Sequence, residues 1–105
     1  VPVAAGAATS LVHPQPERAG HVHGEEGLGG VELQPSPAGP DPRHAVVALA
    51  DVLRTSPEPV TVAAVGPLTN LALLLGVFPE AAARIGRLVV MGGSAARGGN
   101  VTAAA

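Results

Sequence analysis

The feature that most restricts the fold is a run of β-branched and other apolar residues, Val60-Thr61-Val62-Ala63-Ala64-Val65. Apart from Thr61, its odd and even positions are both apolar, so neither face of the expected strand suits water. Strands of this kind are typical of parallel sheets, which are covered on both faces. Gly66-Pro67 ends the run. The sequence therefore predicts a central strand of a parallel sheet.

A helix is predicted before this strand. Asp41-Pro42 is a favourable start, with Asp41 as N-cap and Pro42 at the first helical position, and the helix is expected to end near Thr55. Apolar residues recur at helical spacing and predict one buried face, made of Val46, Leu49, Val52 and Leu53.

Further elements are predicted on either side. A second helix is expected at about residues 67–75, and a helical turn at residues 80–85. Leu88-Val89-Val90-Met91 predicts another buried strand, which Gly92-Gly93 ends. The apolar run Val1 to Ala5 predicts a buried strand at the beginning of the chain.

The order of elements is strand, long loop, helix, strand, helix, strand. This order predicts part of a doubly wound α/β fold, with a mostly parallel sheet, right-handed crossovers and helices on both faces. Ligands bind beyond the carboxyl ends of such strands, so the loops after Ala5, Val65 and Met91 are expected to converge. The turn after Val65 can leave the last strand carbonyl free to face a ligand or a hard cation. A turn that only reverses the chain is the alternative.

The loop from His13 to Pro40 has hardly any periodicity, and we expect a loop of this length to be functional. His21-x-His23-Gly24-Glu25-Glu26 gathers imidazoles and carboxylates that suit a transition metal if the loop folds on itself. A solvated, Gly-rich loop without metal is the simpler interpretation. His13 and His44 are expected at the surface.

Composition argues against several classes of partner. The six basic residues are all Arg, the formal charge is −2, and Phe78 is the one aromatic residue, so nucleic acid is not expected as a partner. The Gly-rich segments follow neither G-x-x-x-x-G-K-[ST] nor G-x-G-x-x-G, which argues against the usual phosphate sites of nucleotides. No cysteine is present, which excludes disulfides and thiolate sites and fits a reducing cytoplasm. No apolar run approaches the roughly 20 residues that span a bilayer, so a membrane is not expected as a partner.

Four segments of the chain carry a resemblance, in the same order: Val1-Pro2-Val3-Ala4-Ala5-Gly6-Ala7, His23-Gly24-Glu25-Glu26-Gly27-Leu28-Gly29-Gly30, Val65-Gly66-Pro67-Leu68-Thr69-Asn70-Leu71-Ala72, and Val89-Val90-Met91-Gly92-Gly93 through Gly99-Asn100-Val101-Thr102. Together they resemble the inosine-uridine preferring nucleoside hydrolases over essentially the whole chain.

The resemblance implies a reaction, a metal and site residues. Members of the family hydrolyse the N-glycosidic bond of ribonucleosides to free base and ribose, with a bound Ca²⁺ that holds the ribose diol and the attacking water. It implies that the backbone carbonyl of Val65 is a calcium ligand. It further implies that Met91 and Asn100 line the ribose pocket, with Asn100 suited to the 5′-hydroxyl. His23 would lie near the base.

The resemblance also implies what residues 1–105 lack. The family's D-x-D-x-x-x-D-D motif, which supplies calcium ligands and the general base, would precede Val1, and further ribose and calcium ligands would follow Ala105. Thr102-Ala103 replaces the commoner Thr-Pro. We therefore expect an internal part of a single nucleoside hydrolase domain, without a catalytic residue, inactive and poorly soluble or molten when expressed alone. The full-length protein is expected to be a cytoplasmic homo-oligomer that serves nucleoside salvage.

Two other functions remain open at this point. One is a non-catalytic α/β binding or structural module, a degenerate paralogue that keeps the scaffold without the metal. The Asp cluster upstream would separate it from an enzyme. The other is a small transition-metal protein built on His21, His23 and Glu25, which a nickel or zinc titration would test.

Overall fold

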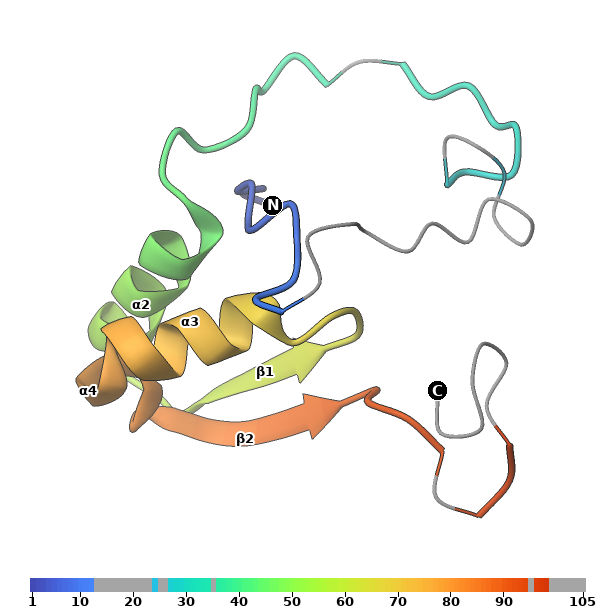
Figure 1. Ribbon diagram of the computed structural model, residues 1–105. Coiled ribbons are helices and arrows are strands. Elements are labelled where there is room, and N and C mark those ends of the chain that lie inside the picture. Colours follow the sequence, from blue (N-terminus) through green and yellow to red (C-terminus); the bar gives the residue numbers. More distant parts are fainter. Residues whose placement is uncertain (13–23, 25–26, 35, 95, 99–105) are drawn as a thin grey trace.

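The computed structural model describes residues 1–12, 24, 27–34, 36–94 and 96–98. The named elements follow one another as α2 (Ala45–Thr55), β1 (Val60–Ala64), α3 (Thr69–Val77), α4 (Pro79–Ala82) and β2 (Ile85–Val90). Figure 1 shows the helices gathered on one side of the two strands. The predicted sequence of helix, strand, helix, helical turn and strand is confirmed, with boundaries that move by a few residues.

The two strands form a parallel pair, and α3 and α4 make the crossover between them. Val60 pairs with Ile85 and Ala64 with Val90, but the register shifts between Val60 and Thr61. Gly86 lies at this shift, where an added Cβ would come 3.2 Å from Pro59 Cα. A parallel pair joined by a helical crossover confirms the α/β class.

The core lies between the helices and one face of the sheet. Its buried members are Val46, Ala50, Leu53, Leu74, Ala81 and Ala82. Val60, Val62 and Ile85 pack against this cluster from the strands. The predicted face of α2 was wrong in one position, because Val52 is 51% exposed and Ala50 is buried instead. Small alanines at the helix contacts let the helices approach closely, which sequence periodicity alone did not indicate.

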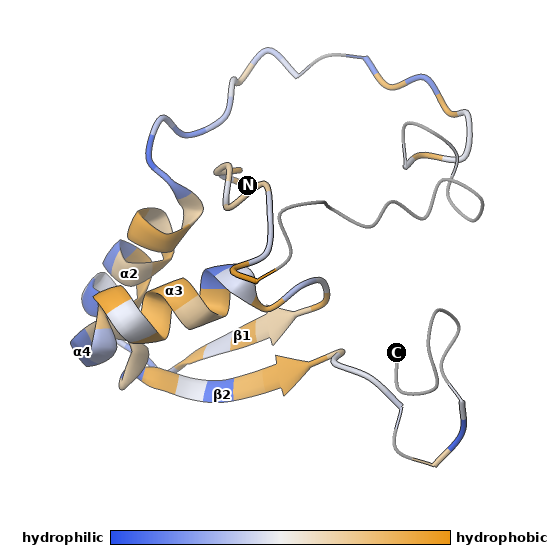
Figure 2. Cartoon of the chain, in the orientation of Figure 1, coloured by the Kyte–Doolittle hydropathy of each residue, from blue (hydrophilic) through white to orange (hydrophobic). Residues whose placement is uncertain are grey.

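The carboxyl half of β2 stays accessible on both faces in the described part of the chain. Side chains alternate between the two faces along a strand, and Leu88, Val89 and Val90 remain 43%, 44% and 43% exposed. The prediction that this strand is buried is therefore wrong for the described structure. Figure 2 shows the apolar character of this half of the strand. The described helices cover one face, so the predicted helices on the second face stay a prediction.

The predicted buried strand at Val1 to Ala5 is wrong. The segment makes a single parallel bridge, between Ala4 and Asp41, and Val1 and Val3 are exposed. Two hydrogen bonds hold it beside the start of α2, from Asp41 N to Val3 O at 2.7 Å and from Ala45 N to Ala5 O at 2.7 Å. It therefore pairs with the segment that leads into α2 rather than with β1.

The predicted helix start at Asp41 is also wrong. The helix begins at Ala45 with His44 as N-cap, and His44 Nδ1 accepts a hydrogen bond from Val46 N at 3.2 Å. Asp41 does not cap this helix, because its carboxylate accepts from Arg43 N and Nε instead. Its own N–H donates to Val3 O and holds the residue beside the N-terminal segment. His44 is exposed, as predicted, and yet it has this structural role.

Candidate functional site

Two of the predicted site segments meet near the carboxyl end of the sheet. Asn70, in the first turn of α3, accepts a hydrogen bond at Oδ1 from Ala7 N at 2.9 Å. Met91 N donates to Ala64 O at 2.9 Å, which places the residue after β2 against the end of β1. The segment after Ala5 and the turn after β1 therefore meet at this end of the sheet, as predicted (Figure 1), while the convergence of the residues after Met91 with them stays a prediction. Openings of this kind are where α/β sheets bind ligands.

Val65 directly follows β1 and is 66% exposed. Within the described residues, no backbone N–H donates to its carbonyl oxygen. Gly66-Pro67 then turns the chain into α3, which begins at Thr69. A carbonyl oxygen without a backbone partner at a strand end is the type of donor that a hard cation prefers.

Met91 is held through its backbone, while its side chain is 69% exposed. The arrangement leaves the thioether free to cover an apolar part of a ligand, and Met adapts well to such contacts. His23 and Asn100 lie outside the described residues, as do His21 and Glu25. Their predicted roles therefore stay predictions.

The described residues fit a calcium site only in part. They hold no group of three or more His, Asp or Glu side chains that could bind a metal. The carbonyl of Val65 is of the oxygen type that Ca²⁺ takes, but the ion needs about six to eight oxygens. The donor chemistry is thus compatible with calcium, and most of the ligand set must come from other residues.

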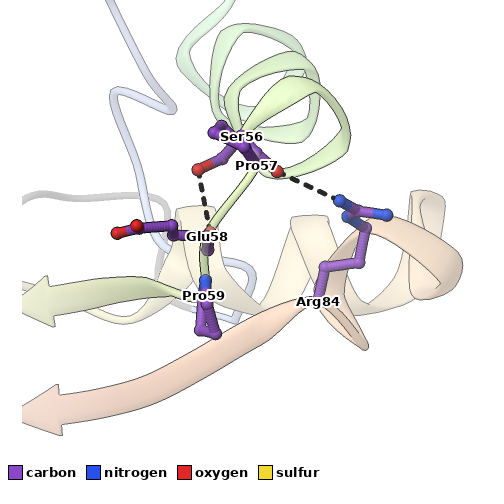
Figure 3. Close-up of a pocket in the computed structure, with 5 residues that line it drawn as sticks. All are labelled: Ser56, Pro57, Glu58, Pro59 and Arg84. Carbon is purple, nitrogen blue, oxygen red and sulfur yellow. Dashed lines mark hydrogen bonds between the residues drawn. The ribbon is translucent and has the colours of Figure 1, made fainter.

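A separate hollow of about 220 Å³ lies at the opposite end of the strands. It is lined by Ser56, Pro57, Glu58, Pro59 and Arg84 (Figure 3). Two of its polar side chains are engaged with their neighbours, since Arg84 Nη2 donates to Ser56 O at 3.2 Å and Ser56 Oγ donates to Glu58 O at 2.8 Å. This hollow belongs to the connection between α2 and β1 and not to the ligand edge of the sheet.

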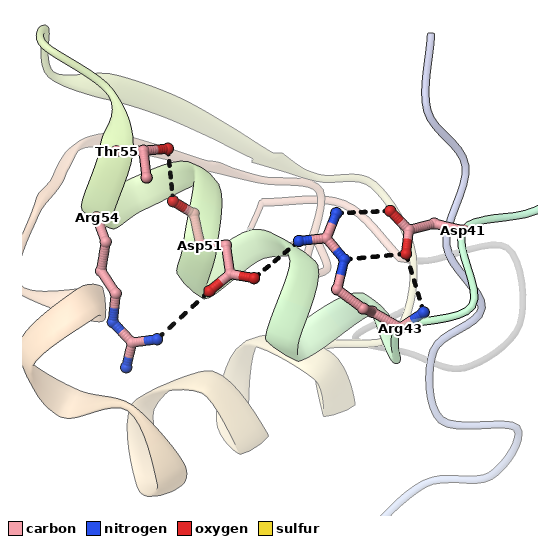
Figure 4. A network of polar contacts seen from close by, with 5 residues as sticks. All are labelled: Asp41, Arg43, Asp51, Arg54 and Thr55. Atoms are coloured by element: carbon pink, nitrogen blue, oxygen red, sulfur yellow. Dashed lines mark hydrogen bonds and ion pairs between the residues drawn. The ribbon is translucent and has the colours of Figure 1, made fainter.

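A chain of ion pairs covers the outer surface of α2 (Figure 4). Arg43 contacts Asp41 at 2.6 Å and Asp51 at 2.8 Å, and Arg54 contacts Asp51 at 3.6 Å. Hydrogen bonds from Arg43 lower the pKa of Asp41 to about 2. These groups satisfy one another and lie on the helix surface, so we assign them to the scaffold.

Asn70 and Gly6 were not identified from the sequence as functional. An Asn in the first turn of a helix that follows Gly-Pro usually marks local capping. Here it bonds to a segment 63 residues away in the sequence, which no local pattern reveals.

The structure is a parallel α/β unit, a class of fold that binds small ligands at the carboxyl edge of its sheet. Comparison with known families agrees with that class. The sequence model of the inosine-uridine preferring nucleoside hydrolases matches residues 1–105, and the chain belongs to this family.

Individual relatives support the assignment. The non-specific ribonucleoside hydrolase RihC of Salmonella agona (strain SL483) is 51% identical over 98 residues, which are 93% of this chain and 32% of RihC. RihC of Salmonella paratyphi B is 50% identical over 98 residues, which are again 93% of this chain and 32% of that protein. The chain thus spans about a third of the length of the curated relatives it matches.

Solved structures give the same result. A purine-preferring ribonucleoside hydrolase from Gardnerella vaginalis superposes with a TM-score of 0.87 at 31% identity, over 98% of this chain and 34% of that protein. The plant nucleoside hydrolase PpNRh1 superposes with the same TM-score of 0.87 at 37% identity, over 100% of this chain and 33% of the plant enzyme. Among the described residues, no helix has the length and apolar character needed to cross a membrane.

Proposed function

We propose that the protein containing this chain hydrolyses the N-glycosidic bond of ribonucleosides to free base and ribose. The observation that carries the proposal is the family match over residues 1–105. The meeting of the segment after Ala5 with the turn after β1 at the carboxyl edge of the sheet supports it, because this edge is where such a fold binds a small molecule. The relatives are named as non-specific and purine-preferring enzymes, so we propose no single base.

We propose Ca²⁺ as the metal and the Val65 carbonyl as one of its ligands. When bound, the ion would orient the ribose hydroxyls and increase the acidity of the attacking water. The chain itself would contribute Met91 as an apolar wall of the ribose pocket and the Asn100 amide as a hydrogen-bond partner of the 5′-hydroxyl. His23 would lie beside the base, where an imidazole can donate a proton to a departing nitrogen.

We further propose that residues 1–105 are an internal part of one nucleoside hydrolase domain. The chain spans 32% of RihC, and the accessible apolar surface of β2 is suited to cover by further polypeptide. No catalytic residue is assigned within residues 1–105, and we expect the isolated segment to be inactive. Homo-oligomerisation, a cytoplasmic location and a role in nucleoside salvage stay predictions.

The test is an assay of the full-length protein for ribose release from inosine and uridine. We expect hydrolysis of at least one nucleoside, loss of activity after treatment with EGTA, and recovery with added Ca²⁺ but not with the same concentration of Mg²⁺. A protein that binds nucleosides without releasing ribose would support the non-catalytic module instead. Activity that persists after complete chelation would refute the calcium proposal while leaving the hydrolase proposal intact.

A further inference from the structure

Asn70 and Gly6 fit together at the carboxyl edge of the sheet. A Cβ added to Gly6 would lie 2.6 Å from Asn70 Oδ1 and 2.8 Å from Asn70 Cγ, which is closer than such atoms can approach. The same Oδ1 accepts the 2.9 Å hydrogen bond from Ala7 N. Glycine at position 6 thus lets the Asn70 side chain approach the backbone closely enough to bind the next amide.

This hydrogen bond links two parts of the proposed site. On one side of the segment, Val3 O and Ala5 O accept from Asp41 N and Ala45 N, which fixes it to the start of α2. On the other side, Asn70 ties it to the first turn of α3. The turn that carries the Val65 carbonyl leads directly into α3, so Asn70 sets how this turn and the segment after Ala5 lie relative to each other.

We infer that Asn70, seated against Gly6, is a positioning residue for nucleoside binding, an inference that rests on the proposed function. Helix α3 is anchored in the core by Leu74 and does not depend on Asn70 for its place. The segment after Ala5 has mostly exposed side chains, so it is the part that shifts when the hydrogen bond is lost. A displacement of this segment, which borders the proposed nucleoside site, weakens substrate binding more than it slows bond cleavage.

The experiment compares variants of the full-length enzyme by steady-state kinetics. Asn70→Ala removes the acceptor and is expected to raise KM about tenfold, the effect of one lost hydrogen bond, with kcat changed less than about threefold. Asn70→Asp keeps an acceptor oxygen of the same reach and is expected to restore KM to within about threefold of the wild type. Gly6→Ala leaves the amide of Asn70 in place but obstructs its approach, and is expected to raise KM like Asn70→Ala.

Two glycine variants serve as controls. Gly86→Ala creates a comparable clash, with Pro59, at the other end of the strands, and is expected to lower Tm without changing KM. Gly76 lies in α3, where an added Cβ meets nothing within 4 Å. Gly76→Ala is therefore expected neither to lower Tm nor to raise KM. The controls separate a general loss of stability from a displacement of the segment after Ala5.

The outcomes are distinguishable. If the wild type is active and Asn70→Ala has an unchanged KM, the inference is overturned and the proposed function stands. The same holds if Asn70→Ala, like Gly86→Ala, only lowers Tm. If Asn70→Ala does not fold, Gly6→Ala decides, and a normal KM in that variant overturns the inference. A wild type that hydrolyses no nucleoside would overturn the proposed function, and the inference with it.

Discussion

Arg84 reaches back from the start of β2 to the end of α2, where its Nε donates a hydrogen bond to the carbonyl oxygen of Leu53 at 2.7 Å. Its Nη2 donates to Ser56 O as well. The last carbonyls of a helix have no partners within the helix, and a guanidinium can satisfy two of them at once. One side chain therefore closes the end of α2 and ties it to β2, two elements that meet only in the folded state.

Replacing Arg84 is expected to lower stability without affecting the ligand edge. We predict that Arg84→Ala lowers the free energy of unfolding by about 1 to 2 kcal/mol, because the Leu53 carbonyl loses a charged donor. Urea unfolding of the full-length protein would measure this loss. KM should not change, since Arg84 lies at the amino-terminal end of the strands, and a raised KM would contradict that separation.

The carboxyl group of Asp41 is expected to titrate at unusually low pH. Hydrogen bonds from Arg43 lower its pKa from 3.8 to about 2. A depressed carboxyl pKa means that the contribution to stability is complete above about pH 4 and is lost as the pH falls through about 2. NMR titration should show this pKa, and Arg43→Ala should return it towards 3.8. Arg54→Ala is the matched control, because Arg54 contacts Asp51 and Glu80 instead, and should leave the Asp41 pKa unchanged.

Calcium binding through Val65 is expected to be insensitive to the Val65 side chain. The proposed ligand is the backbone carbonyl, and the side chain is 66% exposed, so Val65→Ala should keep the Ca²⁺ dissociation constant within about twofold. Isothermal titration of the metal-free full-length protein would measure it. A large loss of calcium affinity in Val65→Ala would argue against a backbone ligand at this position.

Met91 is expected to contribute to substrate binding through its side chain. Met91→Ala should raise KM by about tenfold, because it removes apolar surface from the proposed ribose pocket, whereas Met91→Leu should retain most of the affinity. Val52→Ala, an exposed apolar residue on α2, is the control. Equal KM values for Met91→Ala and the wild type would remove Met91 from the pocket.

Residues 1–105 expressed alone are expected to lack a cooperative melt. Leu88, Val89 and Val90 are more than two-fifths exposed in the described structure, and such apolar surface promotes association and loose packing. ANS fluorescence and thermal unfolding by circular dichroism would test this expectation. A soluble monomer with a sharp transition and little ANS binding would contradict it.

Much of the fold followed from local sequence. The β-branched run at residues 60–65 and the apolar run at 88–91 both became strands, and Gly66-Pro67 ended β1 as expected. The parallel order of elements was also predictable, because a strand, a helical crossover and another apolar strand leave few arrangements that pair the two strands in one sheet. The direction of the strands also defined their carboxyl edge, where we propose that the ligand binds.

The positions that the sequence did not predict are those where distant segments compete for the same groups. Asp41-Pro42 has the local properties of a helix start, yet Val3 O holds the Asp41 backbone in a bridge and Arg43 engages its carboxylate. His44 is the N-cap instead. The run at Val1 to Ala5 is apolar enough for a buried strand, yet only Ala4 bridges to another segment.

The sequence by itself determined the α/β class, the order of the elements and the family, because these depend on apolar periodicity, breaker residues and motifs that are local in the chain. The tertiary structure decided which side chains meet. The hydrogen bond between Asn70 and Ala7, the close approach of Asn70 to Gly6 and the closure of α2 by Arg84 join residues far apart in the sequence. Their physical reason is that a hydrogen bond needs a donor and an acceptor about 3 Å apart, a distance that only the packing of the folded chain sets.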